Sequence, residues 1–158
     1  MNKHILFRVG EQNYAISIAE TDRVVHIENY TIVPDVSSYI IGMQDIEGTI
    51  VPMIDLSERF FKQRLESFEQ TDTVVVKWKE EKIGLTVNEV LAVEDFNEDQ
   101  ISTKEAIGEK KDGVSTSYIS AFVQTKDGIV PILDPHALFS ADQAEEMQAL
   151  LAINHIQN

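Results

Sequence analysis

The chain has 158 residues and no cysteine, and its 27 acidic and 13 basic side chains give a formal net charge of −14. The lack of cysteine excludes disulfides, thiolate metal sites and cysteine nucleophiles. So acidic a surface disfavours nucleic acid and anionic lipid as partners, and 43% apolar residues suffice for a substantial core.

The N-terminal residues alternate like a β-strand and lack the apolar centre of a signal peptide. No apolar run approaches the ~20 residues that a membrane-spanning helix needs. We therefore expect a cytoplasmic protein. Residues 5–9 and 14–18 are β-rich and flank a turn-forming Gly-Glu-Gln-Asn, which predicts a hairpin.

The next predicted elements are a strand over 21–27, with or without a short helix before it, and a strand over 49–54. Pro52 within the second strand predicts an edge or a bulge, because proline cannot donate to a ladder. Asp55 and Glu58 have capping-box spacing, so we expect a short helix over about 56–62.

The second half begins with a predicted hairpin over 73–79 and 83–87. Residues 97–117 are charged and poor in apolar side chains, which predicts a loop with room for one helical turn. A second Val-Pro strand follows, and the Ser140–Gln143 capping-box spacing opens a predicted C-terminal helix over about 141–153.

The chain repeats itself. Shifted by about 79 residues, 39–60 lies over 118–139, and shifted by about 69 residues, 5–20 lies over 74–89. The difference between the shifts falls in the 97–117 loop, where an insertion costs little. We therefore predict a mainly β protein of two similar lobes, over about 1–66 and 67–139.

Asp55 and Asp134 occupy matching positions in the two repeats, so they are the candidates for an acid–base pair in a cleft between the lobes. This would make the chain a small-molecule-binding or hydrolytic β protein. The alternative, which we favour, is that each aspartate caps a helix at a strand end. The four histidines lack metal-ligand spacing, and no phosphate-binding or serine-nucleophile motif occurs. We expect no catalytic residue, no metal and no cofactor.

Four stretches of the sequence resemble the CheW family of bacterial chemotaxis coupling proteins: NYAISIAETDRVV, VPDVSSYIIGMQDIEGTIVPMIDLSERF, GLTVNEVLAV and DGIVPILDPHALF. The similarity runs from about Ile5 to Phe139. It implies two five-stranded SH3-like barrels with a hydrophobic core between them. It also implies a non-enzymatic adaptor that couples the cytoplasmic tips of chemoreceptors to the histidine kinase CheA in signalling arrays.

The resemblance assigns roles to residues by position. Gly42 and Gly48 match family glycines, and four apolar residues lie near the groove where receptor helices would dock: Ile40, Ile41, Met43 and Ile46. Plain core packing is the alternative for these four. The regulatory domain of the kinase would meet the second barrel around Val76, Trp78 and Leu85, although Trp78 could equally cover the core.

One position departs from the family pattern. Where the family has Asn-Leu-Arg-Gly, this chain has Asp45-Ile46-Glu47-Gly48, so an anion replaces a cation. The family often carries an acid two positions before the residue that matches Val24, and we take Arg23 as the nearest charge in that stretch here. We hypothesise that Arg23 and Glu47 form an ion pair with the usual signs exchanged. The alternative is that Glu47 is simply exposed and serves a divergent receptor.

Two relatives of the same class are weaker alternatives: a coupling domain of the CheV kind and an excised regulatory domain of the kinase. The former is disfavoured by the few residues beyond Phe139, and the latter by the starting Met1.

Overall fold

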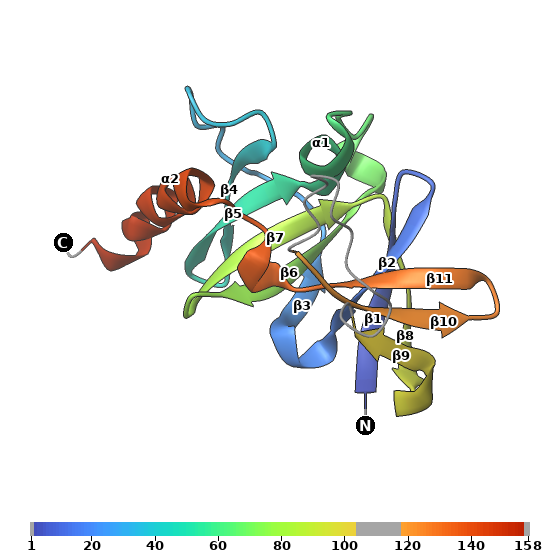
Figure 1. Cartoon of the computed structure of the whole chain (residues 1–158). Coiled ribbons are helices and arrows are strands. Elements are labelled where there is room, and N and C mark those ends of the chain that lie inside the picture. The colour runs from blue at the N-terminus through green and yellow to red at the C-terminus, as the bar shows by residue number, and fades with distance from the viewer. Residues whose placement is uncertain (1, 104–117, 157–158) are drawn as a thin grey trace.

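The computed structural model describes residues 2–103 and 118–156, and strands dominate it (Figure 1). In chain order the strands are β1 (Asn2–Val9), β2 (Gln12–Ser17), β3 (Thr21–Val25), β4 (Ile40–Ile46), β5 (Thr49–Asp55), β6 (Asp72–Trp78), β7 (Glu81–Val87), β8 (Glu89–Phe96), β9 (Ile101–Thr103), β10 (Ile119–Thr125) and β11 (Gly128–Leu133). The α-helices are α1 (Leu56–Phe61) and α2 (Ala141–Leu151). Short 3-10 turns are η1 (Ile18–Glu20), η2 (Phe68–Gln70), η3 (Glu98–Gln100), η4 (Pro135–Ala137) and η5 (Ala152–His155).

The strands form two sheets, which we call the five-stranded lobe and the six-stranded lobe. The five-stranded lobe has the order β3-β6-β7-β5-β4, and the six-stranded lobe has the order β8-β1-β2-β11-β10-β9. Neighbouring strands are antiparallel in both sheets, except for one parallel pair in each sheet. The predicted mainly β, two-lobe fold is therefore confirmed.

Each sheet curls so that consecutive chain segments join its two edges. After β3, the chain crosses to β4, where Thr31 and Met43 exchange backbone hydrogen bonds of 2.7 and 2.8 Å. The buried Gln44 side chain adds bonds to the His26 carbonyl and the Glu28 N–H. In the six-stranded lobe, β8 leads through η3 into β9, which pairs with β10. This closure is what a barrel requires.

The internal repeat survives as matched backbone contacts. The Asp55 N–H donates to the Tyr39 carbonyl at 2.7 Å, and 79 residues later the Asp134 N–H donates to the Tyr118 carbonyl at 2.8 Å. The parallel pairs match as well, since β5 meets β7 as β11 meets β2. The sequence repeat is therefore a repeat of structure.

The strand pairing corrects the predicted lobe boundaries of about 1–66 and 67–139. The hairpin β1–β2 belongs to the six-stranded lobe with β8–β11, and the hairpin β6–β7 belongs to the five-stranded lobe with β3–β5. Each repeat thus lends its first hairpin to the other lobe. Hairpins form from local signals, whereas their parallel partner is chosen by long-range packing, which the sequence pattern does not encode.

Three apolar clusters follow from this exchange. One fills each lobe: the first contains Ile41, Val51 and Met53, and the second contains Leu6, Val123 and Ile132. The largest cluster joins the lobes, and its buried members come from both exchanged hairpins, among them Phe7, Ile16, Val76, Trp78 and Leu85. The two lobes therefore share one core instead of meeting across an open cleft.

The predicted C-terminal helix begins as expected. Ser140 and Gln143 form the reciprocal capping box, α2 ends at Leu151, and η5 continues to His155. Met147 and Leu151 are buried in the core between the lobes, so the helix is docked. In the predicted 97–117 loop, η3 and β9 occupy residues 98–103, and residues 104–117 lie outside the described residues.

Candidate protein-interaction surfaces

The β4–β5 hairpin ends in a two-residue turn, Glu47-Gly48. Both residues have left-handed backbone angles, with φ of 52° and 93°, and Gly48 tolerates this conformation because it lacks a Cβ. The Asp45 carboxylate accepts a 2.8 Å hydrogen bond from the Gly48 N–H. The turn therefore holds the Glu47 side chain in solvent, where 77% of it is exposed.

The hypothesised ion pair is present. The Arg23 guanidinium lies 2.9 Å from the Glu47 carboxylate and 2.7 Å from that of Asp22, and the Lys82 ammonium lies 3.5 Å from Asp22. The hydrogen bond from Arg23 lowers the pKa of Asp22, and the hydrogen bond to Glu47 raises the pKa of Arg23. We call these four residues the charged cluster.

The charged cluster lies on the surface, so its ion pairs contribute little to the free energy of unfolding. Its contacts do hold the Arg23 and Glu47 side chains in defined positions. Sequence reasoning anticipated Arg23 and Glu47 but missed Asp22 and Lys82. Asp22 stands two positions before Val24, where the family often carries an acid, so that acid is retained. The predicted contact is present, but the predicted exchange of signs is wrong: only position 47 departs from the family pattern.

The apolar receptor-groove candidates lie mostly inside the protein. Ile40, Ile41 and Met43 are buried, and Ile46 is half-buried against the core of the five-stranded lobe. Gly42 is packed closely: a Cβ there would lie 2.4 Å from the Thr31 carbonyl oxygen. These positions support the surface from beneath, whereas Arg23, Glu47 and Gly48 reach it.

Ile40 and Ile41 also contribute to the wall of an open pocket of about 490 Å³ beside the start of β4. The loop before β4 supplies the exposed Ile32 to the same pocket. The wall of this pocket is therefore mixed, since Asp35, Ser37 and Arg64 line it beside these isoleucines.

The prediction that three residues of β6 and β7 contact the kinase at the surface is wrong. Val76, Trp78 and Leu85 are all fully buried in the core between the lobes. The Trp78 ring packs edge-on against Phe139, with ring centroids 5.7 Å apart. The physical reason is the exchange of hairpins. It packs β6 and β7 against the other lobe, and this packing buries the face of the hairpin that carries these three side chains.

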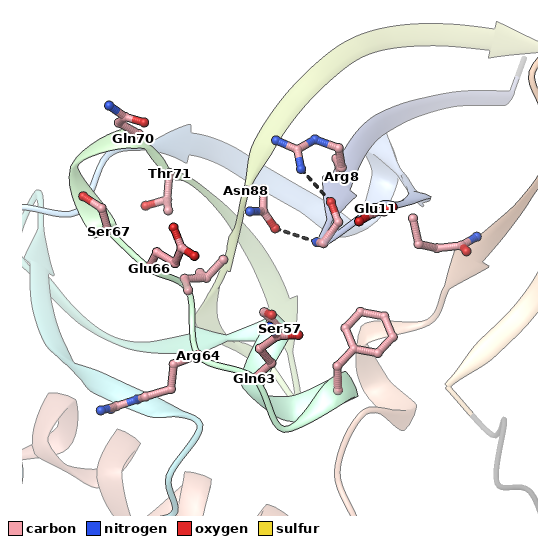
Figure 2. A pocket seen from close by; sticks show the side chains of 14 residues that line it. Arg8, Glu11, Ser57, Gln63, Arg64, Glu66, Ser67, Gln70, Thr71 and Asn88 are labelled. Carbon is pink, nitrogen blue, oxygen red and sulfur yellow. Dashed lines mark hydrogen bonds between the residues drawn. The ribbon is translucent and has the colours of Figure 1, made fainter.

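A larger pocket, of about 670 Å³, lies where the lobes meet at one end of the shared core (Figure 2). The β1–β2 turn forms one wall, α1 and residues 63–71 form the other, and Asn88 stands between them. The Asn88 side chain accepts a 2.6 Å bond from the Gly10 N–H, and Arg8 donates to the Gly10 carbonyl at 2.6 Å. The polar side chains of the pocket thus hold the turn in place.

The two aspartates act as caps. Asp55 is buried and accepts 3.0 Å bonds from the N–H groups of Glu58 and Leu65, while Asp134 accepts one from His136. Burial raises the pKa of Asp55. The expected return bond from Glu58 is not made, because the Asp55 N–H already donates to Tyr39 and the Glu58 carboxylate accepts from Ser38.

Neither aspartate lines the pockets described above. In residues 2–103 and 118–156, no three His, Asp or Glu side chains gather closely enough to hold a metal ion. Neither α1 nor α2 has the length and apolar character needed to cross a bilayer.

Comparisons with known proteins match nearly the whole chain. The model of the family described as CheW-like domain matches residues 3–143. "Chemotaxis protein CheW" of Bacillus subtilis (strain 168) is 26% identical over 143 residues, which are 90% of each chain. The protein of the same name from Treponema pallidum (strain Nichols) is 23% identical over 150 residues, which are 92% of this chain and 86% of the relative.

A solved structure has the same fold. The scaffolding protein TtCheW from Thermoanaerobacter tengcongensis superposes with a TM-score of 0.76 at 26% identity, covering 90% of this chain and 94% of that one. The two-lobe arrangement described above is therefore shared with a scaffold.

Proposed function

The chain belongs to the CheW-like domain family, and from that membership we propose that it is a non-enzymatic scaffold joining chemoreceptor tips to a CheA-type histidine kinase. The observation that carries this proposal is the family match over residues 3–143. The likeness of this chain to a solved scaffolding protein, over most of both chains, adds support. The aspartates have structural tasks as caps, which removes the feature that suggested an enzyme.

The shared core supplies the mechanism. A scaffold transmits a signal when both partners bias the geometry of one module. The exchanged hairpins tie the two lobes through a single apolar cluster, so a partner docked on one lobe acts on a body continuous with the other. We place this action in the cytoplasm, where receptor tips and kinase meet.

We assign receptor recognition to the surface around the charged cluster. Glu47 and Gly48 form an exposed turn, Arg23 pairs with Glu47, and Ile46 contributes half-buried apolar surface. Ile40, Ile41, Gly42 and Met43 hold this surface in shape from below. The anion at Glu47, where the family has a cation, would then select a receptor whose charges differ from those that the usual family residue meets.

A double-mutant cycle tests this assignment. Arg23→Glu and Glu47→Arg should each weaken binding to receptor cytoplasmic fragments, because each places like charges together. The double reversal should recover part of the pair's geometry, so the effects should be non-additive. Purely additive effects, or no effect of either reversal, would remove the charged cluster from the receptor surface. Lys3→Glu changes charge on β1, away from the cluster, and serves as the matched control.

Co-sedimentation tests the function itself. The chain should sediment with receptor fragments and kinase at low ionic strength. Raising the salt concentration should weaken contacts that depend on the −14 surface. Absence of binding at low salt would contradict the scaffold proposal, whereas loss at high salt alone would identify the charged contribution.

A further inference from the structure

Each lobe carries the same short edge sequence. β5 contains Ile50-Val51-Pro52, and β11 contains Ile129-Val130-Pro131. In each lobe the parallel neighbour is paired only beyond the proline, where Met53 meets Gly84 and Ile132 meets Ala15. Before the proline, each strand diverges from that neighbour and leaves one side of its backbone open. The predicted edge character of Pro52 is thus confirmed over this part of β5.

The opening in the five-stranded lobe is filled by the C-terminal segment. The Asn154 carboxamide accepts a 2.8 Å bond from the Ile50 N–H and donates a 2.8 Å bond to the Ile50 carbonyl. On the other side of the opening, His155 bonds to Glu81 at the start of β7 at 2.6 Å. Asn154 therefore satisfies the edge as a neighbouring strand would.

Two further contacts hold the C-terminal segment in place. Met147 and Leu151 are buried in the core, and both the N–H and hydroxyl of Ser37 donate to the Glu146 carboxylate, at 2.8 and 2.6 Å. Figure 1 shows α2 beside β4 and β5, away from the β10–β11 hairpin. The segment thus fills the edge of the five-stranded lobe and does not reach the equivalent edge of the six-stranded lobe.

No described residue fills the equivalent edge in the six-stranded lobe. Ile129 lies opposite Gln124 as Ile50 lies opposite Asp45, so the same backbone groups point away from the paired strand. The Ile129 side chain is 62% exposed, although it is apolar. Among residues 2–103 and 118–156, no side chain or loop bonds to the Ile129 backbone. Gln12 stands where Glu81 stands in the other lobe.

We propose that the open edge of β11 at Ile129 is a docking site for a short segment of a partner protein. The segment would present an asparagine or glutamine side chain to the Ile129 N–H and carbonyl, as Asn154 does to Ile50, and would cover the Ile129 side chain with an apolar residue. The proposal rests on the proposed function, since a scaffold needs partner surfaces. It also places a partner contact on the surface, where the buried Val76, Trp78 and Leu85 cannot provide one.

A partner protein is a better occupant than a second copy of this chain. Two copies would each bring a charge of −14, which opposes their association. In each copy, the C-terminal segment already fills the edge of β5. If it moved to the β11 edge of a second copy, it would leave its own β5 edge open. A neutral or basic partner segment meets neither cost.

A peptide provides the direct test. Residues 150–156 of this chain, which contain no acidic side chain, made as an amidated fluorescent peptide with a photo-crosslinker beside Asn154, should bind the full chain and crosslink to residues 128–130. Ile129→Pro removes the outward N–H together with the isoleucine side chain and should weaken binding by at least about tenfold, which is the loss of one good hydrogen bond. Ile129→Val keeps the backbone and should bind within about twofold of the original chain.

One further variant and two possible outcomes complete the test. Ile129→Lys retains the N–H and removes the apolar contact, so it should also weaken binding even if the proline variant fails to fold. Crosslinks confined to residues 49–51 would mean that the peptide merely replaces the chain's own tail, and would overturn the proposal. A dimer seen by analytical ultracentrifugation and abolished by Ile129→Pro would assign the edge to a second copy and overturn the partner assignment.

The kinase assay separates this inference from the proposed function. If the unaltered chain does not bind kinase or receptor fragments, the proposed function fails. If the unaltered chain and Ile129→Pro sediment equally well with the kinase and the peptide does not bind, the docking edge alone fails. Weaker kinase binding by Ile129→Pro, with receptor binding unchanged, is the result that we expect.

Discussion

Replacing Leu85 with alanine separates a core residue from a surface contact. Leu85 lies on β7 and is fully buried, at 0% exposure, in the cluster that joins the lobes. Removing a buried leucine side chain costs the transfer of its methyl and methylene groups plus the cavity left behind, roughly 2–5 kcal/mol. A domain of this kind is stable by about 5–15 kcal/mol, so the loss is a large fraction of the total.

The assay is urea unfolding followed by tryptophan fluorescence. Trp78 is the single tryptophan and lies in the same cluster, so its emission reports the loss of the shared core. We expect the unfolding midpoint of Leu85→Ala to fall while the denaturant slope stays constant. Val24→Ala, at a half-exposed position on β3, is the matched control and should change stability by less than about 0.5 kcal/mol.

The opposite pattern would refute this reasoning. If Leu85→Ala unfolded at the same urea concentration as the unaltered chain yet lost kinase binding, Leu85 would be a surface contact. The exchange of hairpins would then be wrong as well, because it is what buries this face of β7.

Three further predictions use individual contacts. Gly42→Ala should lower the melting temperature clearly, because its Cβ would meet a backbone carbonyl, whereas Gly48→Ala has open space and should cost only about 1 kcal/mol for its left-handed backbone. Asp55→Asn should keep the side-chain cap of α1 and flatten the pH dependence of stability. Burial raises the pKa of Asp55, so its ionisation lowers the free energy of unfolding as pH rises through that pKa. An unchanged pH profile of the urea midpoint would contradict this. Arg23→Gln should return the lowered pKa of Asp22 toward its ordinary value in an NMR titration; in the unaltered chain this contact stabilises folding above the ordinary carboxyl pKa and is lost as pH falls through the lowered one.

The repeat carried most of the fold prediction. The matched Ile-Val-Pro strands and the paired aspartates predicted two similar β lobes and two caps, and both are present. These features depend on local patterns, namely strand alternation, proline and capping residues, which a sequence displays directly.

The features that sequence missed depend on contacts between distant segments. β6 and β7 are buried along most of their length, and each carries one mainly apolar face, yet the pattern does not say what covers that face. The exchange of hairpins supplies that cover and turns Val76 and Leu85 into core residues. In the same way, Asn154 reads as an ordinary polar residue until the fold brings it to the open edge of β5.

The Arg23–Glu47 pair was predictable for a different reason. Glu47 departs from the pattern of a recognised family, and Arg23 is a cation near the position that the resemblance places opposite it, so the two opposite charges predict a contact. The geometry bears this out at 2.9 Å. Lys82 escaped notice because its contact with Asp22 arises only when β3 and β7 are placed in one sheet, whereas Asp22 adjoins Arg23 in the sequence and could have been found there.

A scaffold of the proposed kind bridges two partners, and bridging can be measured directly. Receptor cytoplasmic fragments are attached to vesicles, the kinase is added, and the kinase that sediments with the vesicles is quantified with and without the chain. The scaffold account predicts that the chain raises kinase recruitment and that an excess of the chain lowers it again, because separate copies then occupy each partner. Kinase recruitment that does not depend on the chain would contradict the account.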